Sequence, residues 1–343
     1  MVQFLIILSL LNKHYGHHNH SHIAHVDMLR VDRENSLESK LPLQSTTDAT
    51  DVVNISHKAS VPKGVAATLL LHAPTWFQRR YTTMIQNAVN NIPEDWVVQI
   101  YYTTSGQSQH GLDINPGIQR FIKTGKVVLM AIPDRVLAVK KKRYELMFEP
   151  WIWQSMMADT VLIFGGNSVI CSNSPYSFAN FTAFDYLGAP WDFKKGVGGD
   201  GGISIRNRNA MLAAIDYAVS KVEAKDRETV FKTWGQEDQF YVRTLIEMNQ
   251  QNSANKWKIA ERNDTLRFAG IGGVVNDNVL VVSGTLPSIS YDDRQRFLNA
   301  CPEVKVFYPA LHDPHCFGAQ PDSEKCAQSI CALKSKKDRR GGC

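Results

Sequence analysis

The chain has 343 residues, of which 43% are hydrophobic and 21% charged, and its formal net charge is +5. This composition is that of a globular protein with a sizeable core, and the length suits one large α/β domain or two smaller ones. Much of the positive charge is local, in residues 140–143 and 334–340, so nucleic acid is excluded from the expected partners.

The N-terminal part of the chain is predicted to be a targeting segment followed by a stalk. Residues 1–11 form an apolar run about as long as a signal-peptide core and too short to span a bilayer alone. We predict a signal peptide or signal-anchor remnant with a His-rich stretch over residues 1–25. A disordered stalk is predicted over residues 26–62, where no hydrophobic period appears. The alternative is a frayed hydrophobic N-terminus.

Glycosylation sequons and cysteines favour the secretory pathway. The sequons begin at Asn54, Asn180 and Asn263. We expect a protein of the Golgi lumen or a secreted one, attached to the membrane through its N-terminus, with glycans on Asn54 or Asn263. Asn180 is expected near the core because Phe181 and Phe184 flank it. The six cysteines agree equally with disulfides in the C-terminal part and with buried free thiols.

From residue 65 onward the chain alternates between predicted strands and helices. Residues 65–71 are a continuous apolar run, typical of a strand buried on both faces. Further strands are predicted at residues 97–102, 127–132, 160–164, 169–171, 279–282 and 304–307, and helices at residues 77–91, 116–123, 136–157, 207–222 and 236–249. This order predicts an open, mostly parallel α/β sheet with helices on both faces. We place it in a single domain over residues 63–333, followed by a basic tail at residues 334–343.

A cluster of glycines surrounds one carboxylate in the middle of the chain. It comprises Gly198, Gly199, Asp200, Gly201 and Gly202. Glycines let a backbone adopt positive φ and approach a ligand closely, so we predict a loop that holds a polar substrate. A side chain at Gly201 is then expected to block the ligand rather than to unfold the protein. The alternative is a plain turn before a helix at Arg206.

Two adjacent carboxylates, Glu237 and Asp238, stand at a predicted helix start. One of them can serve as acid or base for a bound substrate, and the alternative is that both only complement the helix dipole. Neighbours on a helix diverge by about 100°, so spacing does not decide which of the two faces the substrate. Trp191, upstream of the glycines, is either a platform for stacking a ligand or a core residue.

Several segments together resemble a known family. They are residues 151–164, 165–171, 184–191, 198–208, 236–238, 283–287 and 311–318. Between residues 64 and 318 the chain is similar to DUF5672, an uncharacterised, mostly fungal family regarded as glycosyltransferase-like. The resemblance implies a GT-A-like fold with one catalytic domain. It also implies a hexosyltransferase-like activity that moves a sugar from a nucleotide-sugar donor to a hydroxyl of a glycan, glycoprotein or glycolipid acceptor.

The resemblance assigns roles to individual residues. It selects Asp238 over Glu237 as the general base, which makes the reaction inverting. The implied substrate-binding residues are Gly198, Gly199, Asp200, Gly201, Gly202, Trp191 and Asn167. Thr75 and Arg79 follow the first strand, where the nucleotide base and ribose sit in such folds, and Arg143 is implied to reach a donor phosphate.

Metal binding is where the chain departs from the family. Members carry an acidic motif before the position of Cys171, like a reduced Asp-x-Asp metal motif, but this chain has Gly165, Gly166 and Asn167 there. An amide carbonyl brings no charge to offset desolvation of the ion, so Asn167 argues against strong dependence on Mn or Mg. His312 aligns with a metal-ligating histidine, or is a loop histidine bonded to backbone.

Two other functions stay open from the sequence. The Asn167 departure favours a non-catalytic nucleotide- or sugar-binding protein on the same fold. A hydrolase that uses paired carboxylates is the weaker alternative, because no second acid is placed opposite Glu237 or Asp238.

Overall fold

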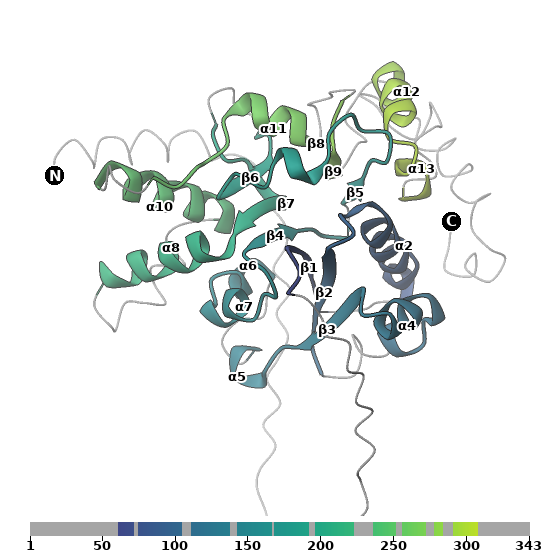
Figure 1. The fold of residues 1–343 in the computed structure, drawn as a ribbon, viewed down its shortest axis with the longest axis horizontal. Helices are drawn as coiled ribbons and strands as arrows, with labels where there is room; N and C mark the ends of the chain where they lie inside the picture. Colours follow the sequence, from purple (N-terminus) through teal and green to yellow (C-terminus); the bar gives the residue numbers. More distant parts are fainter. Residues whose placement is uncertain are drawn as a thin grey trace, which may run out of the picture. The chain divides into compact units, whose positions relative to one another are not determined.

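The computed structural model describes residues 61–71, 75–104, 111–137, 143–166, 168–191, 196–222, 236–251, 256–271, 278–283 and 291–307. They belong to one compact unit, Lys58–Cys343, which contains a six-stranded sheet in the order β3-β2-β1-β4-β7-β6 (Figure 1). Its strands are β1 (Gly64–Leu70), β2 (Trp96–Tyr102), β3 (Val127–Ala131), β4 (Thr160–Ile163), β6 (Tyr186–Ala189) and β7 (Asp200–Asn207).

The direction of the strands confirms the predicted open, mostly parallel α/β sheet. Strands β1, β2, β3 and β4 run parallel, and β7 runs antiparallel to both of its neighbours. The sequence analysis missed β6 and β7, because glycine-rich segments have low strand propensity. The proposed turn before a helix at Arg206 is wrong, since Arg206 lies inside β7 and the next helix begins at Arg208.

Helices cover both faces of this sheet because β1 is apolar on both faces. Along β1, Ala66 and Leu70 pack into one core, and Val65, Ala67 and Leu69 pack into the other. The first core is covered by α2 (Thr75–Asn91) and α4 (Pro116–Lys123), and the second by α7 (Pro150–Gln154), α8 (Arg208–Ser220) and α10 (Glu237–Gln251) (Figure 1). The expectation of helices on both faces is therefore confirmed.

A second, three-stranded sheet has the order β5-β9-β8. It consists of β5 (Val169–Ile170), β8 (Ala269–Ile271), which follows α11 (Arg262–Phe268), and β9 (Val281–Ser283). Cys171 directly follows β5 and forms a disulfide with Cys301, which directly follows α12 (Tyr291–Ala300). The prediction of disulfides rather than free thiols is confirmed for this pair. The disulfide differs from the prediction in one respect, because Cys171 lies outside the C-terminal part of the chain. The other four cysteines lie outside the described residues.

Two predicted elements are wrong. The helix predicted at residues 136–157 is not continuous, because α6 (Arg143–Leu146) ends before α7 begins; α5 (Asp134–Leu137) lies before residues 138–142, which are outside the described part. Pro150 explains the break between α6 and α7, because Glu149 before it is extended, with φ −82 and ψ 120. The strand predicted at residues 304–307 is one helical turn, α13 (Val304–Phe307). Val304 and Phe307 are buried there, and their three-residue spacing puts them on one face of a helix.

The predicted targeting segment, stalk and basic tail lie outside the described residues, so the domain boundaries stay predictions. Within the described ranges, no helix has both the length and the apolar character needed to cross a membrane.

Candidate functional site

A pocket of about 520 Å³ lies beyond the carboxyl ends of the parallel strands. Strand β7 runs against them and Ser204 pairs with Ile163, the last residue of β4, so the start of β7 extends past that edge. The pocket is lined by Tyr144, Met147, Asp200, Gly201, Gly202, Gln236, Glu237 and Asp238. This is the edge at which open α/β sheets bind ligands.

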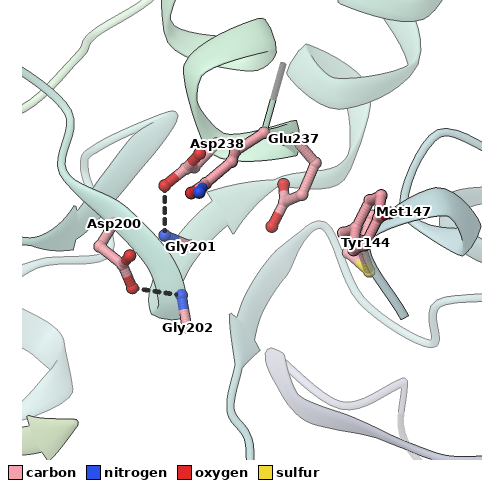
Figure 2. Close-up of a pocket in the computed structure, with 8 residues that line it drawn as sticks. Tyr144, Met147, Asp200, Gly201, Gly202, Glu237 and Asp238 are labelled. Atoms are coloured by element: carbon pink, nitrogen blue, oxygen red, sulfur yellow. Dashed lines mark hydrogen bonds between the residues drawn. The ribbon is translucent and has the colours of Figure 1, made fainter. Parts of the chain in front are cut away.

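The structure brings the two predicted halves of the site together. Asp200, Gly201 and Gly202 come from the start of β7, and Glu237 and Asp238 come from the first turn of α10. In Figure 2 the β7 residues lie on one side of the pocket, with the two acidic residues beside them. A distance of more than thirty residues in the chain separates the two segments, yet both line one cavity.

Tyr144 and Met147 form the opposite side of the pocket (Figure 2). Tyr144 belongs to α6, and Met147 follows this helix directly. The Tyr144 residue is 44% exposed, so part of its surface faces the pocket and solvent. Sequence analysis missed both residues, because an aromatic residue next to a basic cluster gives no signal of a site.

The glycines of the cluster serve different purposes. Gly198 and Gly199 have φ values of 83 and 96, which only glycine adopts readily, but they do not line the pocket. Gly201 and Gly202 do line it. Their N–H groups donate to Asp238 Oδ2 at 3.2 Å and to Asp200 Oδ1 at 2.8 Å (Figure 2). The glycines that need positive φ are therefore not the glycines that line the pocket.

Glycine at position 201 is also required by close packing. A Cβ there would lie 2.5 Å from Arg206 Nη2 and 2.5 Å from Glu237 Oε1. Both atoms are held in a buried ion pair, so they cannot move aside easily. A side chain at this position is therefore expected to disturb the ion pair, and the predicted effect on a ligand stays a prediction.

We expect Gly201→Ala to lower the free energy of unfolding by about 1–3 kcal/mol, because the added methyl group overpacks the ion pair. Urea denaturation of the purified protein measures the change. The matched control is Gly125→Asn, where φ is 72 and no atom lies within 4 Å of an added Cβ. Equal stability losses in the two variants would contradict the packing explanation.

Asp238 is a buried carboxyl group held by three donors. Oδ2 accepts from the Gly201 N–H at 3.2 Å and from Trp191 Nε1 at 3.4 Å, and Oδ1 accepts from the Gln239 N–H at 2.7 Å. Burial raises the pKa of Asp238 above its ordinary value, and the negative charges of Glu237 and Asp200 raise it further. A positioned carboxylate with increased proton affinity is suited to general-base chemistry.

Glu237 does not simply complement the helix dipole, as the alternative had it. Its Oε2 accepts from Arg206 Nη1 at 2.7 Å, and its Oε1 accepts from Nη2 at 2.9 Å. Arg206 is completely buried. Burial by itself would lower the pKa of Arg206, but the Glu237 carboxylate together with Tyr186 and Tyr241 more than offsets this, and the pKa lies above the ordinary value. The pair is thus a charged, bidentate interaction inside the protein.

Sequence analysis missed Arg206, although a signal exists. In the run from Ile203 to Arg206, alternate residues share a face of the strand. An arginine in a strand that is covered on both faces is buried, and a buried charge needs a partner of opposite charge. The identity of the partner could not be read, since Glu237 lies on another element.

Of the two predicted roles of Trp191, the structure supports packing against the core, and ligand stacking stays a prediction. The side chain is half-buried and packs against the second core. Its indole N–H donates to Asp238, and its backbone carbonyl accepts from Arg262 Nη1 at 2.9 Å. The residue therefore contacts the site through a hydrogen bond to a carboxylate.

The remaining predicted site residues are not tested. Thr75 and Arg143 are the first residues of α2 and α6, and Arg79 lies within α2, but the side chains of all three lie outside the described part. Asn167 and His312 also lie outside the described residues.

The described residues do not fit a bound divalent metal. In the described part of the chain, no group of three or more His, Cys, Asp or Glu side chains could hold a metal ion. Glu237 is engaged by Arg206, which leaves Asp200 and Asp238 as the pocket's carboxylates without an ion-pair partner among the described residues. We derive no reaction step through a metal.

A comparison of sequence families confirms the resemblance described above. Residues 126–271 match the model of DUF5672, a family whose description is "protein of unknown function". No curated protein matches the chain.

Solved structures similar to the chain include glycosyltransferases. The chain is 11% identical to the galactosyltransferase LgtC in complex with donor and acceptor sugar analogues, with a TM-score of 0.39, over 69% of this chain and 94% of that one. It is 12% identical to apo GlyE of Streptococcus pneumoniae TIGR4, with a TM-score of 0.31, over 60% of this chain. The match spans 42% of the GlyE chain. Similarities of this size establish neither substrate nor mechanism.

Proposed function

We propose that the protein is a glycosyltransferase that moves a sugar from a nucleotide-sugar donor to a hydroxyl group of a glycan, glycoprotein or glycolipid. The observation that carries the proposal is the placement of Asp238. It lies in a pocket at the carboxyl edge of an open α/β sheet, and three N–H donors fix its carboxyl group. Its raised pKa favours uptake of a proton.

In the proposed step Asp238 takes the proton of the acceptor hydroxyl. The hydroxyl oxygen forms a bond to the anomeric carbon of the donor sugar. The bond from that carbon to the diphosphate oxygen breaks, and its electron pair leaves with the nucleoside diphosphate. Attack opposite the leaving group inverts the anomeric centre, so the reaction needs one carboxylate and no covalent enzyme intermediate.

The charges of the described pocket support a hydroxyl-rich ligand next to β7 and α10. Arg206 is neutralised by Glu237, and Asp200 and Asp238 add two carboxylates to the lining. Carboxylates accept hydrogen bonds from sugar hydroxyls and repel a diphosphate. For the donor diphosphate we propose Arg143 at the start of α6, with the nucleoside near Thr75 and Arg79 at the start of α2.

A thermal-shift screen with nucleoside diphosphates and nucleotide sugars tests the donor class, since a ligand selective for the native state raises stability. The same donors are then tested for hydrolysis and for transfer to simple glycans. We expect one nucleotide sugar both to stabilise the protein and to be consumed. Stabilisation without turnover by any acceptor would favour the non-catalytic binding protein instead.

We expect weak dependence on Mn or Mg, because Asn167 stands where family members carry a carboxylate. Asn167→Asp should strengthen donor binding in the presence of Mn, as measured by calorimetry with and without the metal. Tight Mn-dependent donor binding by the wild type that the substitution leaves unchanged would contradict this.

We also propose that the protein matures in the lumen of the secretory pathway. The Cys171–Cys301 disulfide suits an oxidising compartment. Contrary to the sequence-based expectation, Asn180 is exposed, and so is Thr182 of its sequon. The reason is that Phe178 and Phe181 fill the core.

We therefore expect Asn180 to carry a glycan in the full-length protein expressed in a eukaryotic host. Glycosidase treatment should increase its electrophoretic mobility, and part of that change should be absent from Asn180→Gln. A mobility that glycosidase does not alter, together with free thiols at Cys171 and Cys301, would contradict the lumenal assignment.

A further inference from the structure

Arg206 contacts both of the segments that form the acidic side of the pocket, the first turn of α10 and the start of β7. On the side of α10 its Nη1 and Nη2 atoms donate to Glu237 at 2.7 and 2.9 Å. On its own strand, Nε donates to Ser204 Oγ at 2.8 Å, and Nη2 donates to the Gly201 carbonyl at 3.4 Å. A single planar cation thereby holds Glu237 and the Gly201 peptide in fixed positions.

The Gly201 backbone links Arg206 to Asp238. Its carbonyl accepts from Arg206, while the N–H of the same residue donates to Asp238 Oδ2 at 3.2 Å. A shift of Arg206 would therefore move the Gly201 backbone and, with it, the Asp238 carboxyl group. Glu237, the residue before Asp238, is fixed by the same cation, so the first turn of α10 is held from two directions.

Aromatic rings extend this arrangement to the opposite side of the pocket. The guanidinium carbon of Arg206 lies 5.0, 5.5 and 5.8 Å from the ring centroids of Tyr186, Tyr241 and Trp153, within cation–π range. Trp153 Nε1 donates to the Met147 carbonyl at 2.8 Å, and the Tyr241 hydroxyl donates to the same carbonyl. Met147 lines the pocket opposite Asp200.

We propose that Arg206 is a positioning residue that commits Glu237 to an internal ion pair and leaves Asp238 as the carboxylate that accepts the substrate proton. This inference rests on the proposed function. Arg206 is completely buried, so it does not touch the substrate itself. It affects the reaction because it fixes the positions of Gly201, Asp238 and Met147.

Arg206→Lys separates the effect of the several guanidinium hydrogen bonds from the effect of the positive charge. Lysine keeps the positive charge but cannot donate to Glu237 twice while also reaching Gly201 and Ser204. We expect a folded variant whose kcat falls by about 10²-fold, as for a misplacement on the order of 1 Å, while KM for the donor barely changes. The matched control is Arg208→Lys, because Arg208 pairs with Asp159 at 2.6 Å outside the pocket. The control should keep both kcat and KM.

Glu237→Gln tests which carboxylate takes the proton. Among the described residues, the charged and titratable groups around Asp238 are Glu237, Asp200, the Tyr186 hydroxyl and, behind Glu237, Arg206. Ionised Glu237 raises the pKa of Asp238, so its removal should move the acid limb of the pH–kcat profile to lower pH. If the limb disappears instead, Glu237 is the proton acceptor and the proposal is wrong.

A measurement that needs no turnover keeps this inference apart from the proposed function. The carboxyl group of Asp238 is titrated by ¹³C NMR in the wild type, Arg206→Lys and Arg208→Lys, with Asp238→Asn used for the assignment. We expect the titration midpoint of the Asp238 carboxyl group to differ from the wild type in Arg206→Lys and to equal it in Arg208→Lys. A moved midpoint in a protein without any transferase activity would refute only the function. An unmoved midpoint, or wild-type kcat in Arg206→Lys, would overturn the role of Arg206.

Discussion

Glu237→Leu is expected to lower the free energy of unfolding by about 3–5 kcal/mol, as for other buried ion pairs that lose one partner. The substitution leaves the Arg206 guanidinium completely buried without its carboxylate. Arginine does not release its proton to relieve this cost. Urea denaturation at neutral pH measures the change.

Two variants show whether the effect comes from the unpaired charge. Arg206→Met combined with Glu237→Leu replaces both partners by apolar side chains, and it should recover most of the lost stability. Asp159→Asn removes the exposed ion pair to Arg208, in which the Asp159 side chain is 55% exposed, and should cost about 0–1 kcal/mol. If Glu237→Leu were no more harmful than Asp159→Asn, the buried pair would contribute little to the fold.

Asp238→Asn is expected to lower kcat by about 10²–10⁴-fold, the usual effect of removing a general base. The shape of the side chain stays and its ability to accept a proton is lost. Donor affinity should change little, because the loss falls on the transition state. Steady-state kinetics with the true acceptor measure kcat, and calorimetry measures donor binding. Near-normal turnover would remove Asp238 from the mechanism.

The raised pKa of Asp238 adds a pH dependence with a definite sign. Burial is the main cause, followed by the charges of Glu237 and Asp200. The base must be ionised, so activity should fall as pH drops through a value above the ordinary Asp pKa of about 3.9. An acid limb at that ordinary value would show that another group controls the rate.

The same raised pKa affects stability in the opposite direction. The folded state binds the Asp238 proton more tightly than the unfolded state, so this contribution is present at low pH and is lost as pH rises through the folded pKa. The melting temperature of Asp238→Asn, relative to the wild type, should therefore be higher at neutral pH than at low pH. Thermal unfolding at both pH values measures this.

Local patterns in the sequence predicted the parallel part of the sheet well. The run that became β1 is apolar except at Thr68 and is buried at every position, as a strand covered on both faces must be. Helix α4 has the bounds that were predicted, and its start is fixed by local residues, because Asn115 caps it and Pro116 opens it. Such signals lie within a few residues of one another, so no distant partner is needed to recognise them.

Where the predicted secondary structure was wrong, contacts with residues outside the local segment contributed to the observed structure. A helix was predicted across residues 136–157, but it is interrupted between α6 and α7, where Glu149 before Pro150 is extended. The short run at residues 304–307 has strand residues, yet no described strand pairs with it, and it closes a helical turn instead. Strand β7 exists because β4 and β6 pair with it on both sides, despite its glycines.

The sequence by itself identified the glycine segment, Asp200, Glu237 and Asp238 as candidate site residues. Of these, the three acidic residues and two of the four glycines line the pocket. Only the tertiary structure decided how the two carboxylates differ. Adjacent acids on a helix are equivalent in sequence terms, and their environments depend on what packs against each one. Arg206 from β7 takes Glu237, whereas the Gly201 N–H and Trp191 hold Asp238. Electrostatic interactions are set by distance in space, so a partner thirty-one residues away is invisible to local patterns and decisive in the folded protein.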